Sequence, residues 1–96
     1  MQLVISDVLK RRVDGFEPER FEAFKRVAVD VAQGRAAGSL AHTSAFSGRQ
    51  IYVLERQGYN LYYSRDPKQP GPVVFEEFLS KGEEDLVLEL FAEGPD

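Results

Sequence analysis

The sequence predicts an α+β fold in which an amphipathic helix packs on a three-stranded antiparallel meander, with an acidic helix at the C-terminal end. Apolar side chains recur at three- and four-residue spacing over residues 18–33, which is typical of a helix with one buried face. Residues 39–65 contain aromatic and β-branched runs separated by glycine-containing turns, and residues 76–96 carry eight acids against one base. Since 96 residues have room for one core, we expect a single domain over 1–96.

The expected helix over residues 18–33 has clear start and stop signals. Pro18 suits the first helical position, where its missing N–H costs no hydrogen bond, and Gly34 suits a left-handed residue just past the end. On the outer face, the i,i+4 spacing predicts ion pairs of Arg26 with Glu22 and with Asp30. The stripe that should face the sheet consists of Phe21, Phe24, Val27, Ala28, Val31 and Ala32.

Two strands, 49–56 and 59–65, are expected to form a hairpin around Gln57-Gly58. A two-residue turn there makes cross-strand neighbours of Leu54 and Leu61, Tyr52 and Tyr63, and Val53 and Tyr62. Ser47-Gly48 predicts a second two-residue turn, which would make residues 39–46 the first strand of the meander.

Alternation along these strands assigns side chains to two faces of the sheet. Both faces are partly apolar, and one helix covers only one of them, so the second face must meet the C-terminal segment, the N-terminal segment or another molecule. One face is expected to carry Ala41, Thr43, Ala45, Tyr52, Leu54, Leu61 and Tyr63, and the other Leu40, His42, Ser44, Ile51, Val53 and Tyr62.

The remaining segments are less regular. Residues 66–72 form a loop by composition, with three prolines and a glycine. Residues 72–82 fit either a helix or a fourth strand that opens with Val73-Val74-Phe75. Residues 83–93 are expected to be helical, because acids lead an apolar stripe, although they also alternate as a strand would. Residues 3–13 suggest a short strand followed by a helical turn.

Composition excludes several function classes. Without cysteine there is no disulfide framework, thiolate nucleophile or cysteine-ligated zinc. A net charge of −4 argues against a general nucleic-acid or membrane-surface binder, although residues 1–75 are mildly basic. No signal peptide or membrane-spanning run is apparent, so we expect a cytoplasmic protein without membrane contact.

The chain offers few groups for catalysis. His42 is the only histidine, and no G-x-S-x-G elbow accompanies it. The run Glu83-Glu84-Asp85 lacks the alternating carboxylates and central glycine of a calcium loop, and the glycines form no phosphate-binding loop. We therefore assign no catalytic residue, no metal and no cofactor, and expect a protein that is not an enzyme.

Two family resemblances accompany these patterns. The order of helix, three-stranded meander and C-terminal helix resembles double-stranded-RNA-binding domains, although Glu83, Glu84 and Asp85 stand where those domains present lysines. The stretch 33–81, with G-R-Q-I-Y-V-L-E-R, G-Y-N-L-Y-Y and F-L-S-K-G, resembles the RelE/HigB class of ribosome-dependent RNase toxins. Lys81 matches one basic C-terminal residue of that class, and acids follow it, so no catalytic residue is carried over.

The leading hypothesis is a small protein-interaction module, such as an adaptor, an inhibitor or an immunity-like protein. It would bind another protein, or a second copy of itself as a homodimer, through a sheet face, its acidic C-terminal element or both. That element could instead pair with Lys10-Arg11-Arg12 of a second copy. The alternative is a nucleic-acid-directed protein, with bases stacked on tyrosines and phosphates bound by arginines. The candidate partner-binding residues are Arg49, Tyr52, Arg56, Tyr59, Tyr62, Arg65, Glu83, Glu84 and Asp85.

Overall fold

A computed structural model describes residues 3–45, 47–68 and 71–86 of the chain. These residues form a mixed α+β fold with a five-stranded sheet, so the predicted class is confirmed and the predicted three-stranded meander is part of a larger sheet. In chain order, the elements are β1 (Val4–Ile5), α1 (Asp7–Val13), α2 (Pro18–Ala32), β2 (Ser39–Thr43), β3 (Gln50–Arg56), β4 (Tyr59–Arg65), β5 (Val74–Ser80) and the 3₁₀ helix η1 (Lys81–Leu86).

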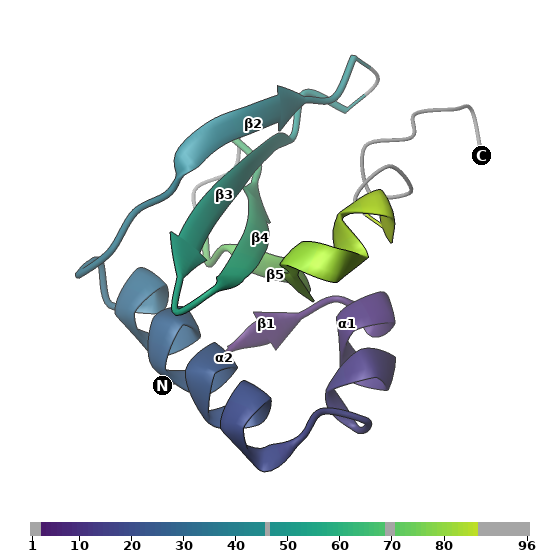
Figure 1. The fold of residues 1–96 in the computed structure, drawn as a ribbon. Coiled ribbons are helices and arrows are strands. Elements are labelled where there is room, and N and C mark those ends of the chain that lie inside the picture. Colours follow the sequence, from purple (N-terminus) through teal and green to yellow (C-terminus); the bar gives the residue numbers. More distant parts are fainter. Residues whose placement is uncertain (1–2, 46, 69–70, 87–96) are drawn as a thin grey trace.

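The strand order in the sheet is β1-β5-β4-β3-β2. Strands β2 to β5 run antiparallel to their neighbours, and the two-residue β1 pairs with β5 in parallel. Figure 1 shows α1 and α2 beside the β1 end of the sheet and β2 at the opposite edge. Within the described residues, no helix combines the length and the apolar character needed to cross a membrane.

Helix α2 begins and ends where the sequence predicts. Pro18 is its first residue, and Gly34, with a φ of 76°, follows the cap residue Gln33. The buried face of α2 packs with Leu9 of α1 against one face of the sheet, where Phe24 meets Phe78 with ring centroids 5.5 Å apart. The buried members of this core are Leu9, Phe24, Val27, Ala28, Val31, Leu61, Tyr63, Phe75 and Phe78.

The exposed face of α2 differs from the prediction in its ion pairs. The Lys25 ammonium contacts Glu22 at 3.3 Å, and Asp30 accepts from Arg35 and Arg56, which belong to other parts of the chain. Arg26 is exposed and forms no ion pair within the described part of the chain. The expected pairs fail because Asp30 binds the two arginines that the fold brings to it, and Glu22 pairs with Lys25 at i+3.

The β3–β4 hairpin confirms the predicted register in full. Leu54 pairs with Leu61, Tyr52 with Tyr63 and Val53 with Tyr62. Gln57 and Gly58 both have positive φ, at 57° and 82°, which two-residue hairpin turns of type I′ require. The predicted faces follow, because Leu61 and Tyr63 face α2, whereas Ile51 and Tyr62 are buried on the other side.

Residues 74–80 form a strand, β5, which decides between the two alternatives for this segment. A β-bulge shifts its register, so that Tyr62 pairs with Glu77 but Tyr63 pairs with Phe75. The extra residue places Phe75 and Phe78 on one face although they are three positions apart. The bulge therefore explains why the apolar spacing of this strand resembles that of a helix.

Strand β2 departs from the prediction in two ways. It ends at Thr43, and the chain reverses between Ser44 and Arg49, where the Ser44 and Ser47 hydroxyls accept backbone N–H bonds and close a loop wider than two residues. The predicted two-residue turn at Ser47-Gly48 is therefore wrong. The register also shifts between Leu40 and His42, which puts Leu40 opposite Tyr52 and on the face opposite to the predicted one.

The second face of the sheet carries a smaller cluster of Ile51, Tyr62 and Leu79, against which Val53 and Leu86 pack. Leu86 is the last residue of η1, so the start of the acidic C-terminal element lies on this face. The described part of the expected helix over 83–93 is 3₁₀-helical, and residues 87–93 lie outside the described residues. The short strand and helix expected over 3–13 are confirmed as β1 and α1.

Candidate protein-binding edge

Strand β2 is the long edge strand of the sheet. It pairs with β3 on one side and, within the described residues, with no strand on the other. Its sequence Ser-Leu-Ala-His-Thr has no charged residue, and four of its five residues are exposed. Leu40 is 54% exposed, the largest fraction among the exposed large hydrophobic residues that the structure describes.

The main chain of β2 presents hydrogen-bonding groups to solvent. The Ser44 N–H donates to the Arg49 carbonyl at 2.9 Å, so residues 44 and 49 form a hydrogen-bonded pair. In an antiparallel ladder such pairs alternate with non-bonded ones. The next pair, Thr43 with Gln50, is therefore non-bonded, and the N–H and C=O of Thr43 point away from the sheet.

The start of β2 is fixed by a close contact with β3. A Cβ atom at Gly38 would lie 2.4 Å from the Val53 carbonyl oxygen, so a larger residue would push the strands apart. The Gly38 N–H also donates to the Tyr63 hydroxyl at 2.6 Å. Glycine is therefore required at the point where the chain enters the edge strand.

The opposite edge, formed by β1, offers much less backbone. It has two residues and leads at once into α1, whose N-cap Ser6 accepts from the Leu9 N–H at 3.1 Å. The Ser6 N–H donates to the Phe75 carbonyl at 2.9 Å, which continues the pairing with β5. Beyond β1, the outer side of β5 is partly closed, because its Glu76 and Phe78 carbonyls accept from the Ser6 hydroxyl and from Arg20. Among the described strands, β2 is therefore the more open edge.

Of the three tyrosines among the candidate partner-binding residues, two use ring faces inside the molecule. Tyr52 stacks on Tyr63 with centroids 5.4 Å apart, and Tyr59 stacks on Phe78 at 4.8 Å. Tyr62 is buried on the second face, where burial raises the pKa of its hydroxyl and the nearby Glu84 carboxylate adds to the increase. These contacts are those expected of cross-strand core pairs.

The three candidate arginines have different environments. The Arg49 guanidinium donates to the Ser64 hydroxyl at 2.7 Å, and this hydroxyl donates to Glu76 at 2.7 Å. Arg56 donates to Asp30 at 2.8 Å. Arg65 is exposed at the end of β4. The structure thus ties two of these arginines to other parts of the fold.

Among the candidate acids, Glu83 has a structural contact that the sequence did not predict. It accepts from Arg20 at 2.6 Å and from the backbone and hydroxyl of Ser80, and these bonds hold the pKa of Glu83 at about 2. The Arg20 guanidinium also donates to the Phe78 carbonyl at 2.7 Å and lies 4.3 Å from the centre of the Phe16 ring. Glu84 and Asp85, in contrast, are exposed.

Glu77 on β5 is a buried carboxylate, with 4% of its surface exposed. Its Oε2 lies 2.9 Å from Arg12 Nε, whereas Oε1 has no hydrogen-bond partner among the described residues. Burial raises the pKa of Glu77 although the charge of Arg12 opposes this. Because a buried ion pair contributes little net stability, this contact chiefly positions α1 on β5.

Neither His42 nor the acidic residues form a metal centre in the described part of the chain, where no three potential ligands come together. His42 on β2 is half-buried and lies opposite Ile51 of β3.

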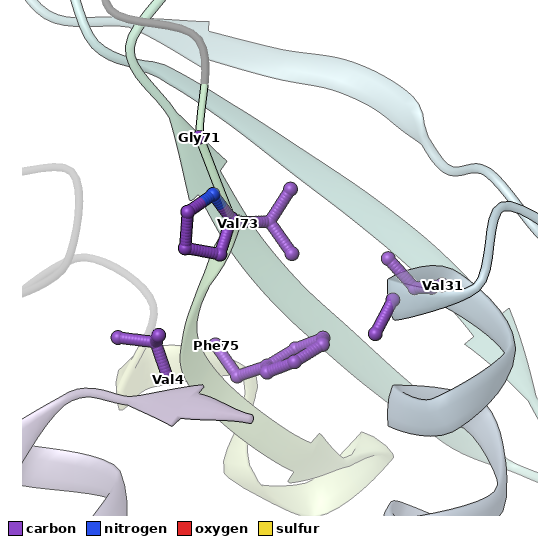
Figure 2. Close-up of a pocket in the computed structure, with 7 residues that line it drawn as sticks. Val4, Val31, Gly71, Val73 and Phe75 are labelled. Atoms are coloured by element: carbon purple, nitrogen blue, oxygen red, sulfur yellow. The ribbon is translucent and has the colours of Figure 1, made fainter. Parts of the chain in front are cut away.

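A cavity of about 180 Å³ lies between the start of β5, β1 and the last turn of α2. Figure 2 shows Val4, Val31, Val73 and Phe75 around it, and Gly71, Pro72 and Ala32 complete the lining. All of these side chains are apolar. Catalysis requires positioned polar or titratable groups, and this lining supplies none.

The predicted meander already makes residues 39–46 an outer strand, but the sequence pattern predicted binding through a sheet face rather than along this edge. A usable signal for this edge was the uncharged composition of residues 39–43, which have smaller side chains than the other predicted strands.

Comparisons of the chain with protein-family models, with curated proteins and with solved structures give no match.

Proposed function

We propose that this chain is a non-enzymatic protein-binding module that captures an extended segment of another protein along the outer edge of β2. The observation that carries the proposal is the uncharged, exposed β2 edge, where the Thr43 N–H and C=O point to solvent. A partner strand would satisfy these groups, and main-chain hydrogen bonds of this kind supply affinity in β-augmentation.

The composition of β2 supports this proposal. Edge strands that must stay unpaired are usually protected by lysine, proline or a covering loop. Residues 39–43 contain neither lysine nor proline. The 54% exposed Leu40 lies beside the unpaired backbone and offers an apolar contact to a partner side chain.

The alternative of a nucleic-acid-directed protein receives less support. Recognition of unpaired bases requires open aromatic faces, whereas the Tyr52 and Tyr59 rings stack on Tyr63 and Phe78. The guanidinium groups of Arg49 and Arg56 donate to Ser64 and Asp30, respectively, within the molecule.

We also propose a cytoplasmic location, with which the absence of cysteine is consistent.

A peptide-display selection on the immobilised full chain tests the proposed function. We expect it to recover extended segments of alternating apolar residues, which bind the unaltered chain and Thr43→Val but not Thr43→Pro. Proline removes the outward N–H of Thr43 without removing a bond to β3, whereas valine keeps the N–H and the β-branched shape. Failure to recover binders, or binders that tolerate Thr43→Pro, would contradict the proposal.

A further inference from the structure

The exposed side of α2 holds a shallow groove of about 390 Å³, on the opposite side of the helix from the core. Its lining contains no residue of β2, and it takes no part in the function proposed above. Val29 contributes apolar surface, and charged side chains surround it. The lining residues are Glu22, Lys25, Arg26, Val29, Asp30 and Arg35.

The groove has an excess of positive charge. Both carboxylates are already paired, since Glu22 lies 3.3 Å from Lys25, and Asp30 accepts from Arg35 at 3.0 Å and from Arg56 at 2.8 Å. The hydrogen bonds from Arg35 and Arg56 lower the pKa of Asp30, so it is ionised at neutral pH. Three bases against two acids in the lining leave a net charge of about +1, and Arg56, which binds Asp30 from outside the lining, adds a further positive charge. Arg26 has no ion-pair partner among the described residues.

The C-terminal segment of this chain has the complementary chemistry. Residues 87–96, V-L-E-L-F-A-E-G-P-D, contain three acids and no base, interleaved with large apolar residues. Acids that alternate with apolar side chains suit a groove with a basic rim and the apolar Val29 within it. The groove and the segment therefore match both in charge and in hydrophobic character.

The fold favours binding between two copies over binding within one. Leu86, which immediately precedes this segment, packs with Ile51, Tyr62 and Leu79 on the sheet face opposite to α2. The 3₁₀ helix η1 also touches the N-terminal end of α2, where Glu83 accepts from Arg20 at 2.6 Å. Within one molecule, ten extended residues, which span at most about 33 Å, would have to pass this end of α2 and then reach the exposed side of the helix. Binding of the segment from a second copy would not require this path, and two-fold symmetry would form the contact twice.

We propose that the groove on α2 binds the acidic segment 87–96 of a second copy of this chain, and that the resulting dimer is held largely by charge. This site differs from Lys10-Arg11-Arg12 on α1, which the sequence suggested for the same segment. Arg12 of that run lies against Glu77, whereas Arg26 in the groove pairs with no acid in the described ranges 3–45, 47–68 and 71–86.

Sedimentation equilibrium of the full chain at low and high salt tests this proposal. We expect a dimer at about 20 mM NaCl that weakens by tenfold or more at about 500 mM, because exposed charges are screened over a few ångströms at high salt. Arg26→Glu and Glu93→Lys should each weaken the dimer by about tenfold, and the two together should restore it. Arg65→Glu, an exposed arginine outside the groove, is the matched control and should leave the dimer unchanged.

Several results would overturn the proposal. A mass that stays monomeric at all concentrations would do so, as would a dimer that is insensitive to Arg26→Glu or a double variant that fails to recover. Weakening by Lys10→Glu but not by Arg26→Glu would move the contact to α1. Binding of a labelled single-stranded RNA by the monomer, lost on Arg26→Glu, would assign the groove to nucleic acid. Thr43→Pro should leave this dimer intact, which separates this proposal from the proposed function.

Discussion

Strands β4 and β2 belong to one sheet and have similar lengths, yet their environments are opposite. Four consecutive residues of β4, Leu61 to Ser64, are buried on both faces of the sheet, whereas four of the five residues of β2 are exposed. The aromatic residues that suggested a binding surface lie in the central strands and form the core. The groups available to a partner, namely the outward N–H and C=O of Thr43 and the Leu40 side chain, lie instead on the uncharged edge strand β2.

The largest expected difference between the two regions is in stability. Phe78 is 1% exposed and contacts the rings of Phe16, Phe24 and Tyr59. Because Phe78→Ala leaves a cavity in this cluster, we expect it to lower the free energy of unfolding by about 3–5 kcal/mol. Leu40→Ala should lower it by less than about 0.5 kcal/mol. Urea denaturation measures both free energies of unfolding. Equal losses in the two variants would contradict the description of Phe78 as a core residue and of Leu40 as an exposed edge residue.

A second prediction concerns the junction between edge and centre. Gly38→Ala should lower the free energy of unfolding by about 2 kcal/mol, because the new Cβ would lie 2.4 Å from the Val53 carbonyl oxygen. Tyr63→Phe, which removes only the hydroxyl that accepts from the Gly38 N–H, should cost about 1 kcal/mol. If Gly38→Ala were as stable as the unaltered chain by thermal denaturation, β2 would not approach β3 as described.

The third prediction is a pH dependence at the end of β5. The bonds from Arg20 and Ser80 hold the pKa of Glu83 at about 2 in the folded chain, below the ordinary value of 4.5. The stabilisation from Glu83 is therefore complete above about pH 4.5 and is lost as the pH falls towards 2. Because Glu83 is partly exposed, we expect Glu83→Gln to cost about 1–2 kcal/mol near pH 7 and much less near pH 2.

Denaturation of Glu83→Gln and Glu84→Gln across this pH range shows whether the loss of stability comes from the bonds that Glu83 makes or from the removal of a negative charge in general. Glu84 is exposed on the same 3₁₀ helix and makes no described bond to Arg20, so its substitution should change stability by less than about 0.5 kcal/mol. The same pH profile for the two variants would show that Arg20 does not select Glu83.

The smallest expected effect on folding is at the edge itself. Leu40→Lys places a charge beside the unpaired backbone of β2 and should change the free energy of unfolding by less than about 0.5 kcal/mol, since Leu40 is 54% exposed. The same change should weaken capture of an apolar extended peptide by about tenfold, because edge lysines oppose strand addition. Fluorescence anisotropy measures the binding, and Leu40→Met is the conservative control.

The sequence predicted the parts of the fold that local patterns determine. The stripe on α2 and the turn at Gln57-Gly58 fix one helix and one hairpin, since each needs only neighbouring residues. Strand β5 stayed ambiguous, because its bulge gives Phe75 and Phe78 helical spacing. The Ser47-Gly48 turn was misassigned, because the side-chain hydrogen bonds of Ser44 and Ser47 close a wider loop.

The candidate site was less predictable than the fold. Whether the outer strand of the predicted meander stays at the edge depends on where β1 and β5 join the sheet, and the pairing of β1 with β5 joins residues about 70 positions apart. The partners of Arg56 and Glu83, namely Asp30 and Arg20, are also distant in sequence. Tyrosine occurs both in interfaces and in cores, and arginine both in interfaces and in intramolecular polar contacts, so tertiary contacts decide between the two.

Amide hydrogen exchange at Thr43, recorded by NMR with and without a selected extended peptide, tests the central claim most directly. If a partner strand pairs with the outer side of β2, its carbonyl accepts the Thr43 N–H, and exchange at this position should slow by about tenfold or more. Unchanged exchange at Thr43, with slowing confined to another surface, would contradict the account.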